Sequence, residues 1–302
     1  GDVIPRRFLS ALGEGNAAPI QQGSGRLELA KMVTSDSNPF LPRVWANRIW
    51  HHTFGRGIVA SVDDFGAMGS PPSHPELLDH LAQALIQNGW STKALLRRLV
   101  LSRTYAMSSA LNADAQQVDP DNLLLHRMPV QRLDAEALRD TILAVSGTLD
   151  PTLFGPSIPV HLNEFSDGRG KPSASGPLDG AGRRSLYLSV RRNFPVPFLT
   201  VFDFPNPAAT MGRRGNSNVP AQSLTLMNDP FVHQEAERWA QRLFAEDVFG
   251  EAARPVEEAR LTSMYLSAFG RAPSAEEQSA GLDYLHARSA AGGTQQEAWT
   301  EL

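Results

Sequence analysis

NPFLPRVWANRIWHHTFGRGIVASVDDFGAMGSPPSHPELLDHLAQALIQNGWSTKALLRRLVLSRTY, residues 38–105, is the stretch that decides the fold. It contains three helical patterns, with a long polar connection between the first and the second. It also holds three of the five Trp and four of the eight His. Apolar residues recur in the three patterns at the spacing of amphipathic helices that pack on a core. The stretch therefore predicts a mainly α-helical protein.

Residues suited to helix ends give approximate bounds for these three helices. The first is expected from about Pro39 to Phe54, with Gly55 as a left-handed residue at its end. Ser73 suits the N-cap of the second helix, with Glu76 completing a capping box. Ser91 suits the N-cap of the third. The apolar face of the first helix is predicted to consist of Leu41, Val44, Trp45 and Ile49.

The remaining sequence divides by composition. A further amphipathic helix is expected over 133–145, and helical patterns return after residue 220, including one from Ser274 that carries Glu277 as part of a capping box. Between them, Pro, Gly, Ser and Asn dominate, and only Ser157–Leu162 and Ser185–Val190 have strand patterns. We predict a helical part over 1–148, a loop-rich insert with a small β-ribbon over 149–220 and a C-terminal helical part over 221–302, within one compact domain.

The totals exclude several classes of protein. The net charge of −4 argues against a general nucleic-acid-binding or anionic-membrane surface. The absence of Cys excludes disulfides, thiolate zinc sites and a Cys nucleophile. No apolar run is long enough to span a membrane. We expect no signal peptide in the chain as given, because no long apolar run follows the charged residues near its start.

The richest cluster of chemically active side chains lies in the opening stretch. Carboxylates and imidazoles together suit a divalent cation or a general acid–base pair. No HExxH zinc pattern is present, and adjacent His side chains on a helix point about 100° apart. As a site, this cluster would use Asp63, Asp64 and His74 as catalytic residues and Arg48, His51 and His52 as ligand-binding residues. In the structural interpretation, Asp63 or Asp64 caps a turn or pairs with Arg48, and His74 belongs to a helix start.

Three pairs of Arg mark the loop-rich region, at 183–184, 191–192 and 213–214. Arg binds carboxylates and related oxyanions through two parallel hydrogen bonds, so Arg191 and Arg192 are candidate residues for an anionic or sugar-like ligand. Tyr187, Phe194 and Phe198 lie nearby in the sequence and could stack on sugar rings. The alternative is an Arg-rich loop seam packed on acidic helices.

Long strings in the chain resemble the planctomycete-specific C-terminal domain of unknown function. The resemblance is carried by NRIWHHTFGRGIVASVDDFGAMGSPPSHPELLDHLA (from Asn47), GWSTKALLRRLVLSRTY (from Gly89), DPDNLLLHRMPVQRLDAEALRD (from Asp119), LYLSVRR (from Leu186), VPAQSLTLMNDPFV (from Val219) and GDVIPRRFL at the first residue. It implies an exported, extracytoplasmic multidomain protein, in which a cytochrome-c-like domain and sometimes a lectin-like domain accompany this one. The gene neighbourhoods of the family hint at polymer breakdown, and the family transfers no catalytic residue to this chain.

These observations favour an accessory or binding module linked to polysaccharide use. The alternative is a hydrolase or lyase that acts on anionic glycans through a cleft lined by Asp, His and Arg. A third hypothesis is an electron-transfer partner that docks a haem domain. Expected partners are other domains of the same polypeptide and a polysaccharide, with no nucleic acid. No cofactor is expected, and a divalent cation is the one candidate that the ligand types suit.

Overall fold

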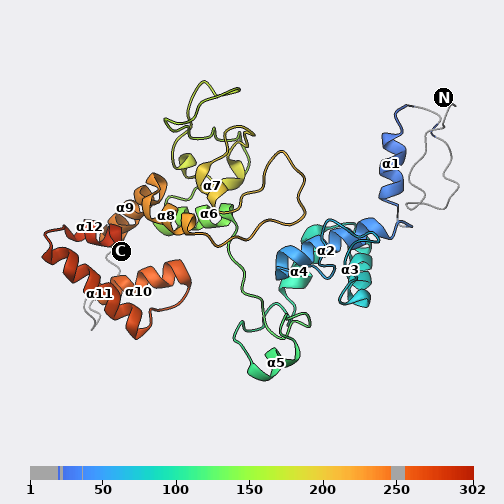
Figure 1. The fold of residues 1–302 in the computed structure, drawn as a ribbon, viewed down its shortest axis with the longest axis horizontal. Helices are drawn as coiled ribbons and strands as arrows, with labels where there is room; N and C mark the ends of the chain where they lie inside the picture. Colours follow the sequence, from blue (N-terminus) through green and yellow to red (C-terminus); the bar gives the residue numbers. More distant parts are fainter. Residues whose placement is uncertain (1–19, 21–22, 36, 246–255) are drawn as a thin grey trace. The chain divides into compact units, whose positions relative to one another are not determined.

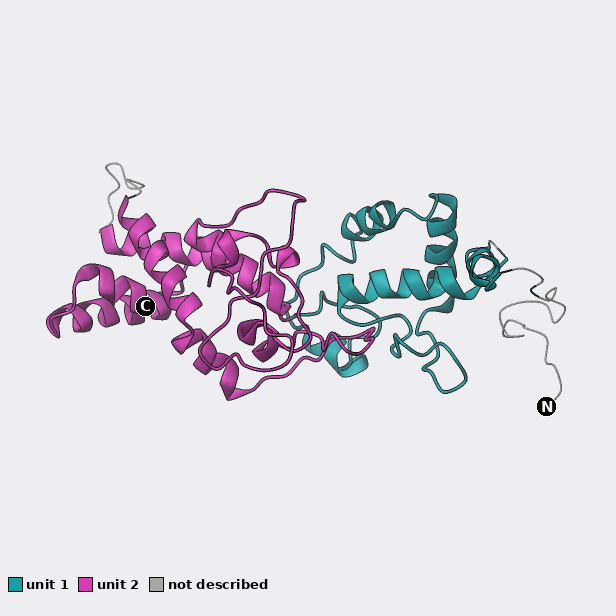
Figure 2. Ribbon diagram, turned by 90° about the horizontal axis from the view of Figure 1, so that it is seen from above, with its two compact units in different colours: residues 1–131 teal, residues 132–302 magenta. Residues whose placement is uncertain are grey.

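The computed structural model describes residues 20, 23–35, 37–245 and 256–302. The chain divides into two compact units, residues 1–131 and 132–302 (Figure 2). Each unit has its own hydrophobic core. The three-part division at residues 148 and 220 stays a prediction, and the string at 1–9 lies outside the described residues. No helix among those described is long and apolar enough to cross a membrane.

The first unit is built from short helices (Figure 1). They are α1 (Arg26–Val33), α2 (Phe40–Phe54), α3 (Pro75–Gln87), α4 (Thr92–Val100) and α5 (Ala113–Val118). The core lies between α2, α3 and α4 and includes Trp50, Phe54, Leu81, Leu85 and Leu99. The three helices predicted within 38–105 are therefore confirmed, whereas α5, which starts after Asn112, was not predicted.

The buried face of α2 differs from the predicted one. Trp45 is 39% exposed, whereas Asn47 is fully buried. The Asn47 amide donates to the carbonyl of Val59 (3.0 Å) and accepts from the amide N–H of Val59 (2.9 Å). These two bonds hold the connection after α2 against the helix, so a polar residue occupies the core face. A side chain at Gly57 would collide with Asn47 and with the Val59 carbonyl, which explains why a glycine precedes this contact.

Two of the predicted helix-end residues are confirmed, and one predicted N-cap is wrong. Ser91 caps α4 through a hydrogen bond from the Ala94 amide (3.2 Å), and Gly55 ends α2 with φ of 80°, as predicted. The N-cap of α3 is His74 and not Ser73. The Ser73 hydroxyl instead donates to the Ile58 carbonyl (3.2 Å), so it holds the connection rather than the helix.

The second unit has two cores that share α9. Its helices are α6 (Ala135–Ser146), α7 (Pro197–Val201), α8 (Pro220–Asn228), α9 (Pro230–Ala245), α10 (Val256–Phe269), α11 (Ala275–Ala290) and α12 (Gln295–Glu301), with 3-10 turns η2 (Gly180–Gly182) and η3 (Ser185–Tyr187). Phe231 of α9 packs with Leu143 of α6 and with Phe198 of α7. Ala240 and Leu243, near the end of the same helix, pack with α10, α11 and α12. The fold is mainly α, as predicted.

The predicted β-ribbon is replaced by single bridges. Residues 157–162 and 185–190 do meet, through one parallel bridge between Ile158 and Leu188 and through a hydrogen bond from the Ser189 hydroxyl to the Ser157 hydroxyl (3.0 Å). Ile158 donates its N–H to Tyr187 and accepts from Ser189 (both 2.8 Å). Because this bridge is isolated, the two segments do not form the predicted β-ribbon. The start of the second segment forms η3, which takes its first residues out of an extended conformation.

Asn47→Ala tests the contact between α2 and its following connection. The substitution leaves a buried donor and a buried acceptor without partners, and we expect the free energy of unfolding of the first unit to fall by about 2 kcal/mol. Urea denaturation followed by Trp fluorescence measures the change. Asn88→Ala, which removes a helix-end amide bonded to Ala84, is the control and should cost clearly less. Equal losses in the two variants would contradict this role for Asn47.

Candidate functional site

Asp63 and Asp64 lie in the exposed connection between α2 and α3. An Asp63 carboxylate oxygen lies 3.5 Å from a guanidinium nitrogen of Arg48 on α2. The Asp64 carboxylate accepts a hydrogen bond from the Gly66 amide (2.8 Å), and its carbonyl accepts from the Ser61 hydroxyl (2.6 Å). The structural interpretation is confirmed for both residues, because one pairs with Arg48 and the other stabilises a turn.

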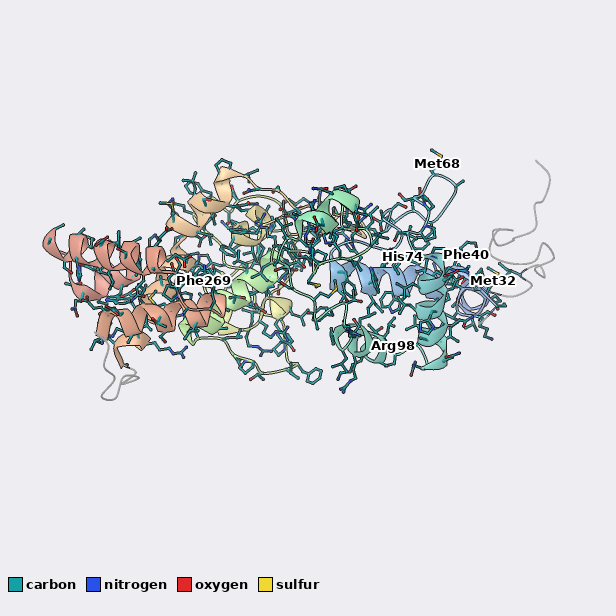
Figure 3. All side chains as sticks on the ribbon, turned by 90° about the horizontal axis from the view of Figure 1, so that it is seen from below. Met32, Phe40, Met68, His74, Arg98 and Phe269 are labelled. Atoms are coloured by element: carbon teal, nitrogen blue, oxygen red, sulfur yellow. The ribbon has the colours of Figure 1, made fainter. Side chains whose placement is uncertain are left out.

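The four His of the opening stretch have separate surroundings. The imidazole of His74, at the start of α3, lies 3.0 Å from the Ser73 hydroxyl (Figure 3). The rings of His51 and His52 are 5.3 Å apart and meet edge to face. The His80 ring contacts the Arg98 guanidinium at 2.6 Å. Within residues 20, 23–35, 37–245 and 256–302, no three His, Asp or Glu are grouped so that they could hold a metal ion.

The candidate residues of the first unit, which lie on α2 and on the connection from α2 to α3, therefore have different contacts. The catalytic assignment of Asp63, Asp64 and His74, and the ligand-binding assignment of Arg48, His51 and His52, remain predictions. Arg191 and Arg192 belong to the second unit, where two classes of loop arginines have different surroundings.

The first class of Arg packs on the acidic side of α6. The Arg214 guanidinium donates to both carboxylate oxygens of Glu136. Arg184 lies 3.5 Å from Asp140, and Arg183 lies 3.6 Å from Asp150, just beyond the helix. Burial raises the pKa of Glu136, but the hydrogen bonds and the charge of Arg214 outweigh it, so the pKa lies below its usual value. These contacts confirm the predicted Arg-rich seam on an acidic helix for Arg184 and Arg214, whereas Arg183 pairs with an acid outside the helix.

Arg139 of α6 organises the loop that carries part of this seam. Its side chain is 3% exposed, and burial lowers its pKa. The guanidinium donates to the carbonyls of Asp179 (2.6 Å) and Arg183 (3.0 Å) and to the Ser185 hydroxyl (3.0 Å). The loop can wrap so closely because Gly180 has a positive φ of 59° and because a Cβ there would lie 2.5 Å from the guanidinium.

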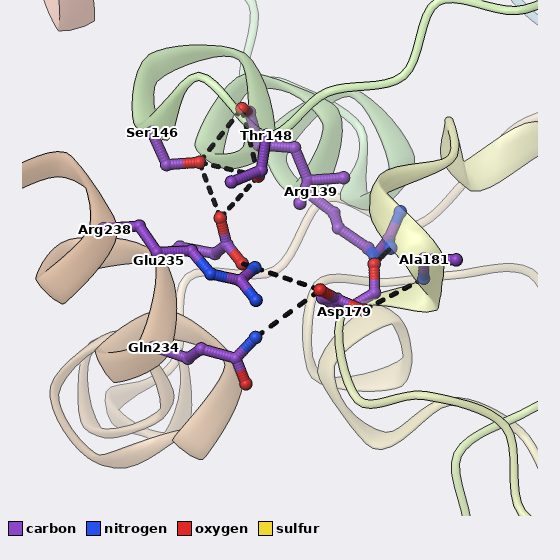
Figure 4. Close-up of polar contacts among 9 residues, drawn as sticks. Arg139, Ser146, Thr148, Asp179, Ala181, Gln234, Glu235 and Arg238 are labelled. Atoms are coloured by element: carbon purple, nitrogen blue, oxygen red, sulfur yellow. Dashed lines mark hydrogen bonds and ion pairs between the residues drawn. The ribbon is translucent and has the colours of Figure 1, made fainter. Parts of the chain in front are cut away.

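A buried carboxylate connects α6 to α9 beside Arg139 (Figure 4). Glu235 of α9 is 1% exposed. It accepts hydrogen bonds from the hydroxyls of Ser146 and Thr148 and from the Arg238 guanidinium, each at 2.6 Å. Arg238 also donates to Asp179 (3.0 Å), and these charged bonds raise its pKa.

The network around Glu235 was missed from the sequence. The available signal is that Glu235 follows Phe231 by four residues and so lies on the apolar stripe of α9. A charged residue in such a place needs buried partners. The sequence does not identify them, because Ser146 and Thr148 lie nearly ninety positions earlier, with separations of 89 and 87 residues. The network is a structural clamp, since each carboxylate oxygen of Glu235 is already bonded within the protein.

The second class of Arg lies on two neighbouring turns. A backbone bond from Lys171 to Gly168 closes the first turn (3.2 Å), and one from Phe194 to Arg191 closes the second (3.1 Å). The Asn193 amide donates to the Arg169 carbonyl (3.0 Å) and joins the two turns. The cationic turns, as we call residues 168–171 and 191–194, carry four exposed cations that make no ion pair with any described residue: Arg169, Lys171, Arg191 and Arg192.

The aromatic residues expected beside these cations are not available to a ligand. Phe194 and Phe198 are buried, at 7% and 4% exposure. Arg183 lies over the ring of Tyr187, 4.3 Å from its centroid. Phe165, which precedes the first turn, is 82% exposed and presents its ring to solvent. The exposed aromatic of this region therefore comes from the loop before the turns and not from the segment around Arg191.

Comparison with protein families matches residues 25–285 to the family described as Protein of unknown function (DUF1553). Searches of curated proteins and of solved structures gave no match. The family match covers most of both units, including the α2–α3 connection, the clamp around Glu235 and the cationic turns.

Glu235→Ala tests the clamp between α6 and α9. Removing one partner of a buried charge network leaves Arg238 and two hydroxyls without their acceptor, and we expect the free energy of unfolding of the second unit to fall by about 3 kcal/mol or more. Glu237→Ala, at an exposed position of the same helix, should change it by about 0.5 kcal/mol or less. Thermal and urea unfolding of both variants measure the difference. A clamp is excluded if Glu235→Ala is as stable as Glu237→Ala.

Glu136→Gln tests the seam through its pH dependence. Since the pKa of Glu136 is lowered in the folded protein, its stabilising contribution is complete above the unfolded value of 4.5 and is lost as the pH falls through the folded pKa. The variant should therefore be less stable than wild type near neutral pH, and the difference should shrink below pH 4.5. Urea titrations over this range measure it, with Glu276→Gln, an exposed carboxylate, as the control. A pH-independent difference contradicts the pairing with Arg214.

Proposed function

We propose that this chain, which belongs to the family described as Protein of unknown function (DUF1553), is a non-catalytic binding module for an anionic polysaccharide. Its place would be in an exported, extracytoplasmic protein alongside other domains of the same polypeptide. That location and those partners rest on the sequence resemblance. Binding of this kind needs no cofactor.

The observation that carries the proposal is the pair of cationic turns. Arg191 and Arg192 are exposed and unpaired within the described chain, whereas Arg184 and Arg214 are engaged by acids of α6. A guanidinium without an acid partner can take a carboxylate or sulfate through two hydrogen bonds. The four cations belong to two turns joined by Asn193, so a polymer could contact several of them at once.

Features around the turns agree with a polysaccharide rather than a small anion. The exposed ring of Phe165 offers an apolar face on which a sugar can stack. The turns are surface features, and a repeating polymer gains affinity from several weak contacts along its length. The chain as a whole is acidic, so binding would depend on this local cluster and not on net charge.

A non-catalytic role is supported by the first unit. Most glycoside hydrolases place two carboxyl groups on either side of the scissile bond, free to act as acid and as base or nucleophile. Asp63 and Asp64 are instead engaged with Arg48 and with the turn at Gly66, and His74 contacts Ser73. A hydrolase or lyase that uses these side chains is the alternative to the proposal, and the binding experiment below also separates the two.

Arg191→Ala with Arg192→Ala should weaken binding of polygalacturonate by about tenfold, since two oxyanion contacts are lost. The matched control is Lys93→Ala with Arg97→Ala, which removes two exposed cations from α4 and should leave the affinity unchanged. Calorimetric titration of the wild type and both double variants measures the affinities. Dextran, a neutral polymer, should not bind to any of them.

The proposal fails if the Arg191 and Arg192 variant binds polygalacturonate as tightly as wild type, or if the α4 variant is weakened to the same degree. The same samples should be followed for release of new reducing ends. Product formation by the wild type that disappears in Asp63→Asn would replace the binding module by the hydrolase or lyase.

A further inference from the structure

The second unit contains an apolar pocket between α9, α10, α11 and α12, which the proposed function does not use. Its volume is about 500 Å³, within the range of pockets that hold ligands or the anchoring side chains of a partner. Core residues such as Leu261 and Met264 contribute to its lining, and aromatic side chains make up much of the rest: Trp239, Tyr265, Phe269, Tyr284 and Trp299.

The polar side chains that line the pocket are already bonded within the helices. The Glu277 carboxylate accepts from Arg271 (both oxygens, 2.7 Å) and from the Ser274 amide (2.8 Å), which lowers its pKa to about 2. The Tyr284 hydroxyl donates to Glu301 (3.2 Å), and the Thr300 hydroxyl donates to a backbone carbonyl. Because these groups have partners, the pocket favours an apolar occupant over a sugar or a nucleotide.

The apolar surface continues beyond the pocket along α10. Phe269, at the end of that helix, is 65% exposed, and Leu266 is 52% exposed (Phe269 is labelled in Figure 3). The Phe269 ring lies 5.3 Å from that of Tyr265, so the exposed edge and the pocket wall form one aromatic surface. An occupant that covers both must be longer than a compact small molecule. An elongated partner with several apolar side chains fits this shape better.

The charge around the pocket is acidic. Residues 256–302 carry seven Asp and Glu against three Arg and no Lys. One of these Arg, Arg271, lies over the rings of Tyr265 and Phe269, but its charge is paired with Glu277 at 2.7 Å. On α11, Glu276, Ala280 and Asp283 recur at the i, i+4 and i+7 spacing of one helix face. Ala280 lines the pocket, and both acids are exposed. The charges that flank the pocket therefore select for a basic partner and disfavour a second copy of this surface, which would bring like charges together.

We infer that this pocket docks a basic amphipathic helix of a partner protein. Its apolar side chains, spaced at three and four residues, occupy the pocket and the exposed edge at Phe269. Its Lys or Arg side chains lie against Glu276 and Asp283. Helices bind to apolar grooves in this way when one face is apolar and the flanking charges are complementary.

The test uses two labelled peptides of about 18 residues, or about five helical turns. The first is an amphipathic helix with Leu on one face, at spacings of three and four residues, and Lys on the other. The second has the same Leu positions and carries Glu in place of each Lys. Fluorescence anisotropy with the full chain should detect binding of the Leu/Lys peptide and not of the Leu/Glu peptide. Ala280→Trp should fill the pocket and weaken binding by about tenfold or more. Ser289→Trp, at an exposed position of the same helix that does not line the pocket, is the matched control and should bind like wild type.

Charge reversal provides the second arm. Glu276→Lys with Asp283→Lys should lose the Leu/Lys peptide and gain the Leu/Glu peptide, while circular dichroism shows the helical content unchanged. The inference is overturned if the two peptides bind equally well, if neither binds, or if Ala280→Trp binds like Ser289→Trp. It is also overturned if the protein self-associates and Ala280→Trp abolishes that association, because the occupant is then a second copy.

Discussion

The requirement that a buried charge be fully bonded shapes the second unit. Arg139 and Glu235 are 3% and 1% exposed, and neither could remain in the core without partners. The loop after Asp179 closes around the guanidinium of Arg139, and the end of α6 supplies two hydroxyls to the carboxylate of Glu235. A mainly helical unit thereby acquires ordered loops, since buried polar groups fix them where no sheet does.

Ion pairing also separates the loop arginines into two groups. Arg184 and Arg214 pair with acids of α6, so their charges are neutralised and they stabilise the contact between loop and helix. The cationic turns at 168–171 and 191–194 keep their charges exposed. Asn193 joins the two turns through its bond to Arg169. Exposed cations without acid partners on an acidic protein are an arrangement that stability alone does not explain, and they underlie the proposed binding of an anionic polymer.

Local patterns allowed most helices to be predicted, but contacts between distant residues could not be. Ser91 and Ser274 cap their helices as expected, because caps depend on neighbouring residues. Asn47 was not among the residues predicted for the apolar face of α2, although its two bonds to Val59 place it in the core. The partners of Glu235 likewise come from another helix. The residues proposed for catalysis could be selected from the sequence because their side chains are chemically reactive. The bond that joins the cationic turns could not be predicted, because it links two loops and loops have no periodic sequence pattern.

A crystal structure of the protein with an oligogalacturonate bound is the most direct measurement of the central claim. The account expects the uronate carboxylates to lie against the guanidinium groups of Arg191 and Arg192, with neighbouring sugars toward Arg169 and Lys171. An oligosaccharide seated instead on the α2–α3 connection, with a glycosidic bond facing Asp63, Asp64 or His74, would contradict the binding module and point to a catalytic site there.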